Sequence, residues 1–261
     1  MSLLTGKTVV VSGVGAGLGH QVASAVVRDG GNAVLGARTE ANLAKSAAEI
    51  DPDGAHTAYR STDITDERQC VALAELGVER FGRIDAVVHV AAWDSYFGGL
   101  EEADFATWQS VIDVNLLGSL RMTRACLPAL KRAGGSVVFI GTQSAVAAPT
   151  QVSQAAYAAS KGALTSAMYS LARELGPHRI RVNTVLPGWM WGPPVQAFVQ
   201  FTAQTEKVPE DDVRKRLTSR MALPDLATDG DVADAAVFLA SDRARAITGQ
   251  SLLVNAGELM R

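Results

Sequence analysis

The sequence predicts an α/β fold: a single doubly wound domain with a parallel sheet of about seven strands and helices on both faces. Apolar, β-rich runs alternate with helical patterns along all 261 residues, as expected when each strand is followed by a crossover helix. The first run leads directly into a glycine-rich turn. No linker, repeat or low-complexity segment divides the chain, so one domain is expected over residues 1–261.

The expected strands share a high content of β-branched and apolar residues. They are Thr8–Ser12, Asn32–Ala37, Ala55–Arg60, Ile84–Val90, Ser136–Thr142, Arg179–Val185 and Ser251–Asn255. Helices are expected in the intervals. Two of them, Phe105–Arg132 and Ser153–Leu175, are long and rich in small or apolar residues, which predicts a helix covered on more than one side.

The glycine-rich turn joins the first predicted strand to the first predicted helix. Glycines stand at positions 13, 15, 17 and 19, and an apolar helical pattern follows from Val22 to Val27. Glycines allow a tight turn and let a pyrophosphate approach the first amides of a helix, whose dipole favours an anion. The alternative is a packing turn without a ligand. The flanking strand and helix favour nucleotide binding.

Composition favours small-molecule chemistry. Hydrophobic residues make up 48% of the chain and charged residues 20%, and the formal net charge is -3, so no general attraction to nucleic acid or an anionic membrane is expected. Cys70 and Cys126 lack metal-ligand spacing, which argues against a disulfide framework or metal site and for a reducing compartment. Residues 1–7 lack the pattern of an export signal, and a cytoplasmic location is expected.

Tyr157 and Lys161 are four residues apart in a predicted helix, so they lie on one face, one turn apart. A neighbouring ammonium lowers the pKa of a phenol and makes it a usable acid and base near neutral pH. Chance spacing on an amphipathic helix is the alternative for an isolated pair of this kind.

Taken together, Ser12-Gly13-x-x-x-Gly17-Leu18-Gly19 and Tyr157-x-x-x-Lys161 resemble the classical short-chain dehydrogenase/reductase family. The resemblance covers essentially the whole chain. It includes Asp63-Ile64, Asn115, Arg181-Val182-Asn183, Pro187-Gly188 and Thr248-Gly249-Gln250. It implies a Rossmann-type domain that binds NAD(P)(H), a mobile substrate loop at about 189–224, and a homotetramer or homodimer built through the long helices.

The resemblance assigns the adenosine end of the cofactor to Gly13, Gly17, Leu18 and Gly19 with the end of the second strand. An acid there would hold the ribose hydroxyls of NAD, whereas Arg suits the phosphate of NADP. Ala37 stands at the acid position and Arg38 follows it, so NADP(H) is expected, with NAD(H) as the alternative. Asp63 and Ile64 would contact the adenine. Asp63 could instead cap the following helix.

At the nicotinamide end, the resemblance assigns Ala91, Ala92, Pro187 and Gly188 to cofactor contacts. Two departures stand here. His89-Val90 replaces the usual Asn pair, and His89 is interpreted as structural rather than catalytic. The Thr that many members have four residues after the Gly is missing, because Gly192 occupies that position.

The resemblance also assigns catalytic roles. Tyr157 would transfer the proton, Lys161 would lower its pKa and hold the ribose, and Asn115 would support a proton relay, with a helix kink as the alternative for Asn115. A hydroxyl near the end of the fifth strand would bind the substrate oxygen. The strand frame points to Thr142, whereas counting back from Tyr157 points to Ser144; Thr142 is preferred.

Aromatic residues follow two strands at the edge where parallel sheets bind ligands. Trp93 follows the fourth strand and Trp189 and Trp191 follow the sixth, which predicts an apolar substrate pocket. Phe198 and Phe201, at helical spacing, either line this pocket or pack a lid helix against the body.

The predicted function is an NAD(P)(H)-dependent oxidoreductase that interconverts a secondary alcohol and a ketone on an apolar substrate. One alternative is a 3-oxoacyl-carrier-protein reductase, for which Lys131, Arg132 and Arg179 would form a basic docking patch. Another is a dinucleotide-binding regulator without catalysis. Intact Asn115, Tyr157 and Lys161 argue against the regulator.

Overall fold

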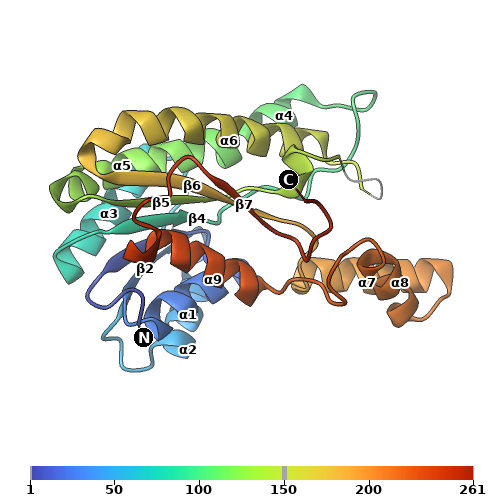
Figure 1. The fold of residues 1–261 in the computed structure, drawn as a ribbon, viewed down its shortest axis with the longest axis horizontal. Coiled ribbons are helices and arrows are strands. Elements are labelled where there is room, and N and C mark those ends of the chain that lie inside the picture. Colours follow the sequence, from blue (N-terminus) through green and yellow to red (C-terminus); the bar gives the residue numbers. More distant parts are fainter. Residues whose placement is uncertain (1, 149–151, 261) are drawn as a thin grey trace.

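The computed structural model describes residues 2–148 and 152–260, and its seven parallel strands are ordered β3-β2-β1-β4-β5-β6-β7. The strands are β1 Thr8–Ser12, β2 Asn32–Ala37, β3 Thr57–Ser61, β4 Ala86–His89, β5 Gly135–Ile140, β6 Ile180–Pro187 and β7 Ser251–Val254. The doubly wound fold predicted from the sequence is confirmed, and helices cover both faces of the sheet (Figure 1).

The α-helices alternate with the strands. They are α1 Leu18–Arg28, α2 Glu40–Ile50, α3 Glu67–Phe81, α4 Phe105–Ile112, α5 Ser119–Ala133, α6 Ala155–Leu175, α7 Pro193–Glu206, α8 Glu210–Thr218 and α9 Asp229–Ala240. Four short helices complete the described segments: η1 Asp113–Gly118, η2 Gln143–Ala145, η3 Gly176–His178 and η4 Asp242–Ala244.

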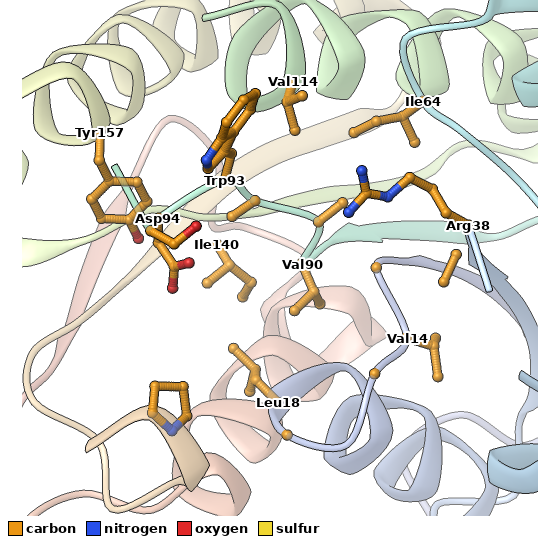
Figure 2. A pocket seen from close by; sticks show the side chains of 18 of the residues that line it. Val14, Leu18, Arg38, Ile64, Val90, Trp93, Asp94, Val114, Ile140 and Tyr157 are labelled. Atoms are coloured by element: carbon orange, nitrogen blue, oxygen red, sulfur yellow. The ribbon is translucent and has the colours of Figure 1, made fainter. Parts of the chain in front are cut away.

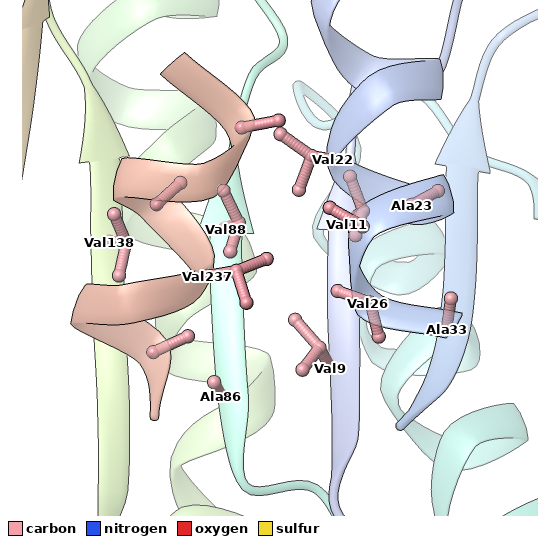
Figure 3. Packing of buried hydrophobic residues seen from close by; sticks show 14 of the residues in the cluster. Val9, Val11, Val22, Ala23, Val26, Ala33, Ala86, Val88, Val138 and Val237 are labelled. Atoms are coloured by element: carbon pink, nitrogen blue, oxygen red, sulfur yellow. The ribbon is translucent and has the colours of Figure 1, made fainter. Parts of the chain in front are cut away.

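Strand alternation divides the interior into two cores. Successive side chains of a strand point to opposite faces, so Val9 and Val11 enter the core under α1 and α9, while Val10 enters the core under α3, α5 and α6. Figure 3 shows the first core, which lies between the sheet and the helices α1 and α9. In it, Val237 of α9 packs against side chains of the strands. Both faces of the central strands are thus buried, which explains why β1, β2, β4, β5 and β6 are nearly continuous apolar runs.

The strand order reverses beside β1. This strand pairs with β2 on one side and with β4 on the other, so the chain winds outward in both directions from it. In open parallel sheets, a crevice forms outside the carboxyl ends of the strands at such a switch point. The glycine turn after β1 and the segment after β4 both begin there.

Element boundaries depart from the prediction in two informative places. β5 ends at Ile140, so Thr142 does not lie in the strand but caps the short helix η2, its hydroxyl accepting from the Ser144 amide. The helix predicted over 105–132 is interrupted by one π-helical stretch, Asp113–Gly118. Wide turns of this type occur mostly within α-helices and frequently at functional sites.

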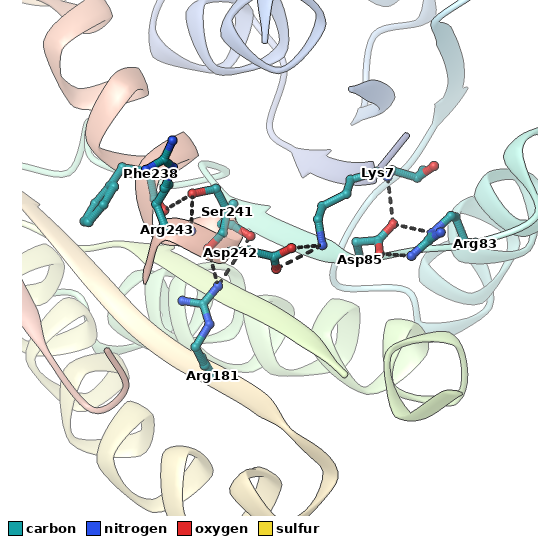
Figure 4. Close-up of polar contacts among 10 residues, drawn as sticks. Lys7, Arg83, Asp85, Arg181, Phe238, Ser241, Asp242 and Arg243 are labelled. Atoms are coloured by element: carbon teal, nitrogen blue, oxygen red, sulfur yellow. Dashed lines mark hydrogen bonds and ion pairs between the residues drawn. The ribbon is translucent and has the colours of Figure 1, made fainter. Parts of the chain in front are cut away.

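Polar groups close the amino edge of the sheet, opposite the carboxyl ends. The Asp85 carboxylate accepts from the Thr8 amide and from Arg83, and Lys7 forms an ion pair with Asp242 at 3.0 Å (Figure 4). Arg181 donates to the carbonyl oxygens at the end of α9, where such a cation is favourable. These contacts tie β1, β4, β6 and α9 together.

The α7–α8 helix pair projects from the body beyond the carboxyl edge (Figure 1). It has a small core of its own, made by Val199, Ala203, Val213, Leu217 and Leu226. The two ends of the segment meet, because the Trp191 amide donates to the Ala227 carbonyl at 2.7 Å. The α7–α8 pair is thus an insertion between β6 and α9 whose two ends are held together.

No helix among residues 2–148 and 152–260 combines the length and apolarity needed to cross a membrane. Cys70 on α3 and Cys126 on α5 are buried thiols without a disulfide, and burial raises the pKa of Cys70 to about 11. Both cysteines pack in the core under α3, α5 and α6 as small apolar side chains.

Candidate active site

A cleft of about 1220 Å³ lies along the carboxyl ends of the central strands (Figure 2). Many of the residues that the sequence singled out line it. They are Gly13, Gly17, Leu18, Arg38, Asp63, Ile64, Ala91, Ala92, Trp93, Thr142, Tyr157, Lys161, Pro187 and Gly188. Gly19, Asn115, Ser144, Trp189 and Trp191 do not form part of the lining.

The glycine turn is packed so closely at Gly13 and Gly19 that no side chain fits at these two positions. A Cβ on Gly13, whose φ is 94°, would lie 2.2 Å from the Ala91 amide nitrogen, and a Cβ on Gly19 would lie 2.2 Å from the Gly13 carbonyl oxygen. The turn therefore presents backbone to the cleft and brings the start of α1 against it. Such a cradle fits an anionic diphosphate.

Arg38 extends its guanidinium into the cleft from the end of β2 (Figure 2). The side chain is exposed and makes no ion pair with any carboxylate of the described residues. Ala37 and Thr39 flank it in the cleft wall. The position offers a free cation and no acid, which suits a phosphate on the adenosine ribose.

Asp63 and Ile64 form the cleft wall above Arg38. The Asp63 carboxylate accepts from the amide and hydroxyl of Thr65, while the cap of α3 is Asp66, which accepts from the Arg68 amide. The alternative interpretation, in which Asp63 caps the following helix, is therefore wrong. Ile64 is buried against Gly118, where an added Cβ would approach it to 2.7 Å.

Tyr157 and Lys161 stand one turn apart on α6 and reach the opposite end of the cleft. The Lys161 Nζ lies 6.0 Å from the centre of the Tyr157 ring and donates to the Ile140 carbonyl at 2.7 Å. Lys161 is buried, and this desolvation lowers its pKa to about 8. A cation thus sits beneath the phenol in a low-dielectric setting.

Spacing alone predicted that the pKa of Tyr157 is lowered, but in the structure it is raised above its usual value. Desolvation is the main cause, and the charge of Asp94 adds to it. A hydrogen bond with the Thr142 hydroxyl acts in the opposite direction. The sequence could reveal the neighbouring Lys161 but not the burial that raises the pKa of the phenol.

Asn115 holds the segment after β4 from within the π-helical stretch. Its side-chain oxygen accepts from the Trp93 amide at 2.7 Å, and its Nδ2 donates to the Trp93 carbonyl and to the Ser160 hydroxyl. Ser160 in turn donates to the Tyr157 carbonyl. Asn115 therefore connects three elements of the site, and the wide helical turn brings it to them.

Thr142, rather than Ser144, faces the reacting end of the cleft. Thr142 lines the cleft and bonds the Tyr157 phenol, whereas Ser144 lies outside the lining. Thr142 is therefore our predicted partner of a substrate oxygen, and Thr142→Ala should lower kcat by about tenfold or more, because that hydrogen bond would be lost. Ser144→Ala is the matched control and should change kcat little. The reverse ranking in steady-state assays would assign the role to Ser144.

His89 occupies the core rather than the cleft. Its Nε2 lies 2.9 Å from the Thr123 hydroxyl, and its ring stacks on Phe139 at 5.0 Å between centroids. Burial, with a smaller contribution from the charge of Lys161, lowers its pKa to about 3, so the ring is neutral. This setting agrees with the structural interpretation of His89.

Pro187 and Gly188 form the floor of the cleft at the end of β6. A Cβ on Gly188 would lie 2.8 Å from the Asn255 side chain, which itself donates to Gln143 at 2.9 Å. Gln143 donates on to Glu258. The floor is therefore supported from below by a polar chain that reaches the C-terminal segment.

The tryptophans after β6 pack with the helix pair. Trp189 stacks obliquely on Phe198, with centroids 5.1 Å apart, and the Arg214 guanidinium lies 4.8 Å from the Trp191 ring centre. Both rings join the small core of α7 and α8 instead of the cleft wall. Phe201 is exposed on α7, and Trp93 is the predicted aromatic that lines the cleft.

Three carboxylates in the cleft, Asp94, Asp113 and Asp229, were not identified from the sequence, and Asp113 is paired with Arg121. Asp94 follows Trp93 and lies beside Tyr157, and Asp229 at the start of α9 lies between Gly17 and Gly192. Burial raises the pKa of Asp229. A single acid in a loop has no periodicity to mark it. The available signal was position, since Asp94 lies in the segment that follows the fourth strand, which ends at His89.

Comparisons with known proteins point in one direction. A family model described as enoyl-(acyl carrier protein) reductase matches residues 13–258. The L-fucose dehydrogenase of Bos taurus is 32% identical over 252 residues, covering 97% of this chain and 89% of that protein.

Solved structures agree with these matches. A short-chain type dehydrogenase/reductase from Mycobacterium ulcerans superposes with a TM-score of 0.87 at 29% identity, covering 98% of this chain and 90% of that one. An actinorhodin polyketide ketoreductase, in a structure with NADPH, gives 0.88 at 27% identity, with 98% of each chain covered.

Proposed function

Because the chain belongs to the short-chain dehydrogenase/reductase family, we propose that it is an NADP(H)-preferring oxidoreductase that interconverts a secondary alcohol and a ketone. One observation carries the proposal. A single cleft has a glycine cradle and a free guanidinium at one end, and Tyr157, Lys161 and Thr142 at the other. This arrangement can hold a dinucleotide and present its reactive end to an acid–base group.

The residues of the cleft fit such a cofactor. A side chain on Gly13 or Gly19 would collide with neighbouring backbone, so glycine keeps the turn tight beside the cleft, and Arg38 is a cation without a protein partner among the described residues. Ala91, Ala92 and Gly188 leave space at the other end. When bound, the nicotinamide would accept or donate the hydride.

The chain's own residues would move the proton. In ketone reduction the Tyr157 phenol donates its proton to the substrate oxygen, and in alcohol oxidation the phenolate accepts it. The raised pKa of Tyr157 keeps the phenol protonated and ready to donate. The Thr142 hydroxyl would hold the substrate oxygen, and the Lys161 ammonium would stabilise the phenolate as it forms. Asn115 would fix the backbone that carries Trp93.

The proposal is tested by assaying the purified protein with NADP(H) and NAD(H) against a panel of substrates. The panel contains sterols, terpene alcohols, aryl alcohols, polyols and 3-oxoacyl thioesters. We expect nucleotide-dependent turnover of a secondary alcohol or its ketone. Tight nucleotide binding without turnover of any member would favour a regulator instead.

Arg38 provides the test of cofactor preference. Hydrogen bonds to charged groups contribute roughly 1.5–3 kcal/mol, so Arg38→Ala should raise the dissociation constant for NADPH about tenfold or more and leave that for NADH nearly unchanged. Ala37→Asp should go further, because the new carboxylate repels the phosphate and offers the ribose an acceptor. Titration of both nucleotides measures these effects.

Arg60→Ala is the matched control for this titration. Arg60 is an exposed Arg at the end of the neighbouring strand β3 and lies outside the cleft lining, so its loss removes the same charge at a similar depth. It should change neither constant appreciably. Equal weakening of NADPH and NADH by Arg38→Ala would contradict the NADP assignment.

The carrier-protein alternative receives less support. Lys131 and Arg132 end α5, and Arg179 precedes β6, so all three lie near the amino edge of the sheet. The cleft opens at the carboxyl edge. A carrier docked on this basic patch would be on the wrong side of the sheet to deliver a substrate.

We also propose that the protein forms homo-oligomers through its long helices. Phe105 on α4, Leu117 in η1 and Tyr169 on α6 are 63%, 41% and 52% exposed, which is high for large apolar side chains. The three elements lie together on one face of the sheet (Figure 1). Because both cysteines are buried thiols, a reducing compartment is the proposed setting.

A further inference from the structure

Asp94 lies at the reacting end of the cleft. Its side chain points toward the Tyr157 phenol from the segment that follows β4 (Figure 2). The charge of Asp94 acts on both Tyr157 and Lys161. It adds to the raised pKa of Tyr157, and it partly opposes the desolvation that lowers the pKa of Lys161. A carboxylate is thus close to the atoms where the substrate oxygen must bind.

The backbone around Asp94 is held from two sides. Asn115 bonds both the amide and the carbonyl of Trp93, and the Gln154 side chain donates to the Asp94 carbonyl. Further on, the Gly98 amide donates to the Ser153 carbonyl, and the Ser153 hydroxyl donates to the Gly98 carbonyl. The segment is therefore fastened to η1 and to the start of α6, the helix that carries Tyr157.

The Asp94 carboxylate is available to a ligand. The residue is exposed to the cleft, and no hydrogen bond or ion pair with another described residue engages its side-chain oxygens. Of the other carboxylates near the cleft, Asp63 is engaged by Thr65, Asp113 by Arg121 and Asp104 by the first amides of α4, whereas Asp229 lies at the start of α9, away from Tyr157. An ionised carboxylate only accepts hydrogen bonds, so its ligand must donate one.

We propose that Asp94 selects secondary alcohols that carry a second hydroxyl beside the reacting carbon, with its carboxylate accepting a hydrogen bond from that hydroxyl. This inference rests on the proposed function and narrows it, because the sequence alone led to an expectation of an apolar substrate. Trp93 would supply the apolar wall and Asp94 the polar contact.

A neutral hydroxyl fits the site better than an ammonium. Lys161 already places one cation next to Tyr157, with its Nζ 6.0 Å from the ring centre. A second cation between Asp94 and Tyr157 would be repelled by the first, in a setting where desolvation strengthens such interactions. A hydroxyl gains a charge-assisted hydrogen bond without that repulsion.

The experiment compares matched substrates within each variant. The kcat/KM of cyclohexanol, its vicinal diol and the corresponding vicinal amino alcohol is measured for wild type, Asp94→Ala, Asp94→Asn and Glu101→Gln. Glu101 is an exposed acid of the same segment that lies outside the cleft lining, so its variant controls for charge. Calorimetric titration of the same three compounds into the protein saturated with NADP provides a readout that does not require turnover.

In wild type and in Glu101→Gln, we expect kcat/KM for the diol to exceed that for cyclohexanol by about tenfold or more. The diol gains one hydrogen bond to a charged group, which is sufficient for a ratio of this size. Asp94→Ala should abolish this ratio, and Asp94→Asn should reduce it, in both turnover and affinity. An unchanged ratio in Asp94→Ala, or no diol preference in wild type, would overturn the inference. A stronger preference for the amino alcohol would overturn the choice of a hydroxyl.

The two proposals fail in different ways. If none of the alcohols or ketones of the wider panel is turned over, the proposed function fails. The affinity ratio between diol and cyclohexanol still decides the role of Asp94 in that case. If alcohols are oxidised with equal ratios in wild type and Asp94→Ala, the proposed function stands and the role of Asp94 is rejected.

Discussion

Replacing Tyr157 with Phe is expected to lower kcat by roughly 10²–10⁴-fold, the usual contribution of a positioned acid–base group. The ring would still pack beside Lys161 and Asp94, so the cleft should keep its shape. What is lost is the hydroxyl that bonds Thr142 and that would exchange a proton with the substrate oxygen. Steady-state assays with the preferred substrate measure the loss.

Nucleotide binding is the control for this variant. The dissociation constant for NADPH should change less than about tenfold in Tyr157→Phe, because the glycine turn and Arg38 lie at the other end of the cleft. A variant that binds the nucleotide and retains kcat within tenfold of wild type would remove Tyr157 from the mechanism.

The largest expected effect on stability comes from Gly19→Ala. The new Cβ would lie 2.2 Å from the Gly13 carbonyl oxygen and 2.8 Å from the Val14 Cα, so backbone atoms would have to move. Overpacking usually costs about 1–3 kcal/mol, and we expect the upper end of that range or more in the free energy of unfolding. Nucleotide binding should be lost with it, because the turn and the start of α1 shift together.

Gly15→Ala is the matched control within the same turn. An added Cβ there meets no atom within 4 Å, and the residue does not require positive φ. Its free energy of unfolding should stay within about 0.5 kcal/mol of wild type in urea denaturation. Similar destabilisation by both substitutions would mean that the close contact at Gly19 is relieved without cost.

The sequence was most informative where chemistry and chain order coincide. The strand Thr8–Ser12, the glycine turn and α1 are contiguous, so their roles could be predicted from local pattern alone. The helical spacing of Tyr157 and Lys161 was sufficient to place both on one face of α6. The parallel sheet followed from the alternation of strands and helices.

Features that depend on contacts distant in sequence could not be predicted in this way. The π-helical stretch brings Asn115 to Trp93 and Ser160, which lie 22 and 45 residues away. β5 ends at Ile140, where its pairing with β6 ends. The sequence therefore placed Thr142 in the cleft correctly, but it placed Thr142 within the strand, whereas Thr142 lies just after it.

Burial is the other quantity that local pattern does not supply. Desolvation is the main cause of the raised pKa of Tyr157 and outweighs the hydrogen bond with Thr142. It likewise distinguishes Trp93, in the cleft wall, from Trp189 and Trp191, which pack against α7 and α8. All three tryptophans follow strands at the same edge of the sheet. Trp189 and Trp191 differ from Trp93 because the chain after β6 continues into α7 and α8, against which they pack.

The hydrogen bond that joins the two ends of the α7–α8 segment has a thermodynamic consequence. Because Trp191 and Ala227 are bonded where the segment leaves and re-enters the body, we expect the pair to move as one unit without displacing β6 or α9. The work required is set by a few peripheral contacts, such as the Arg220–Glu258 ion pair and the bond from the Ala222 amide to Ala256. In the proposed enzyme, movement of this pair would let substrate exchange without global unfolding, and a bound dinucleotide would stay in place while the pair opens.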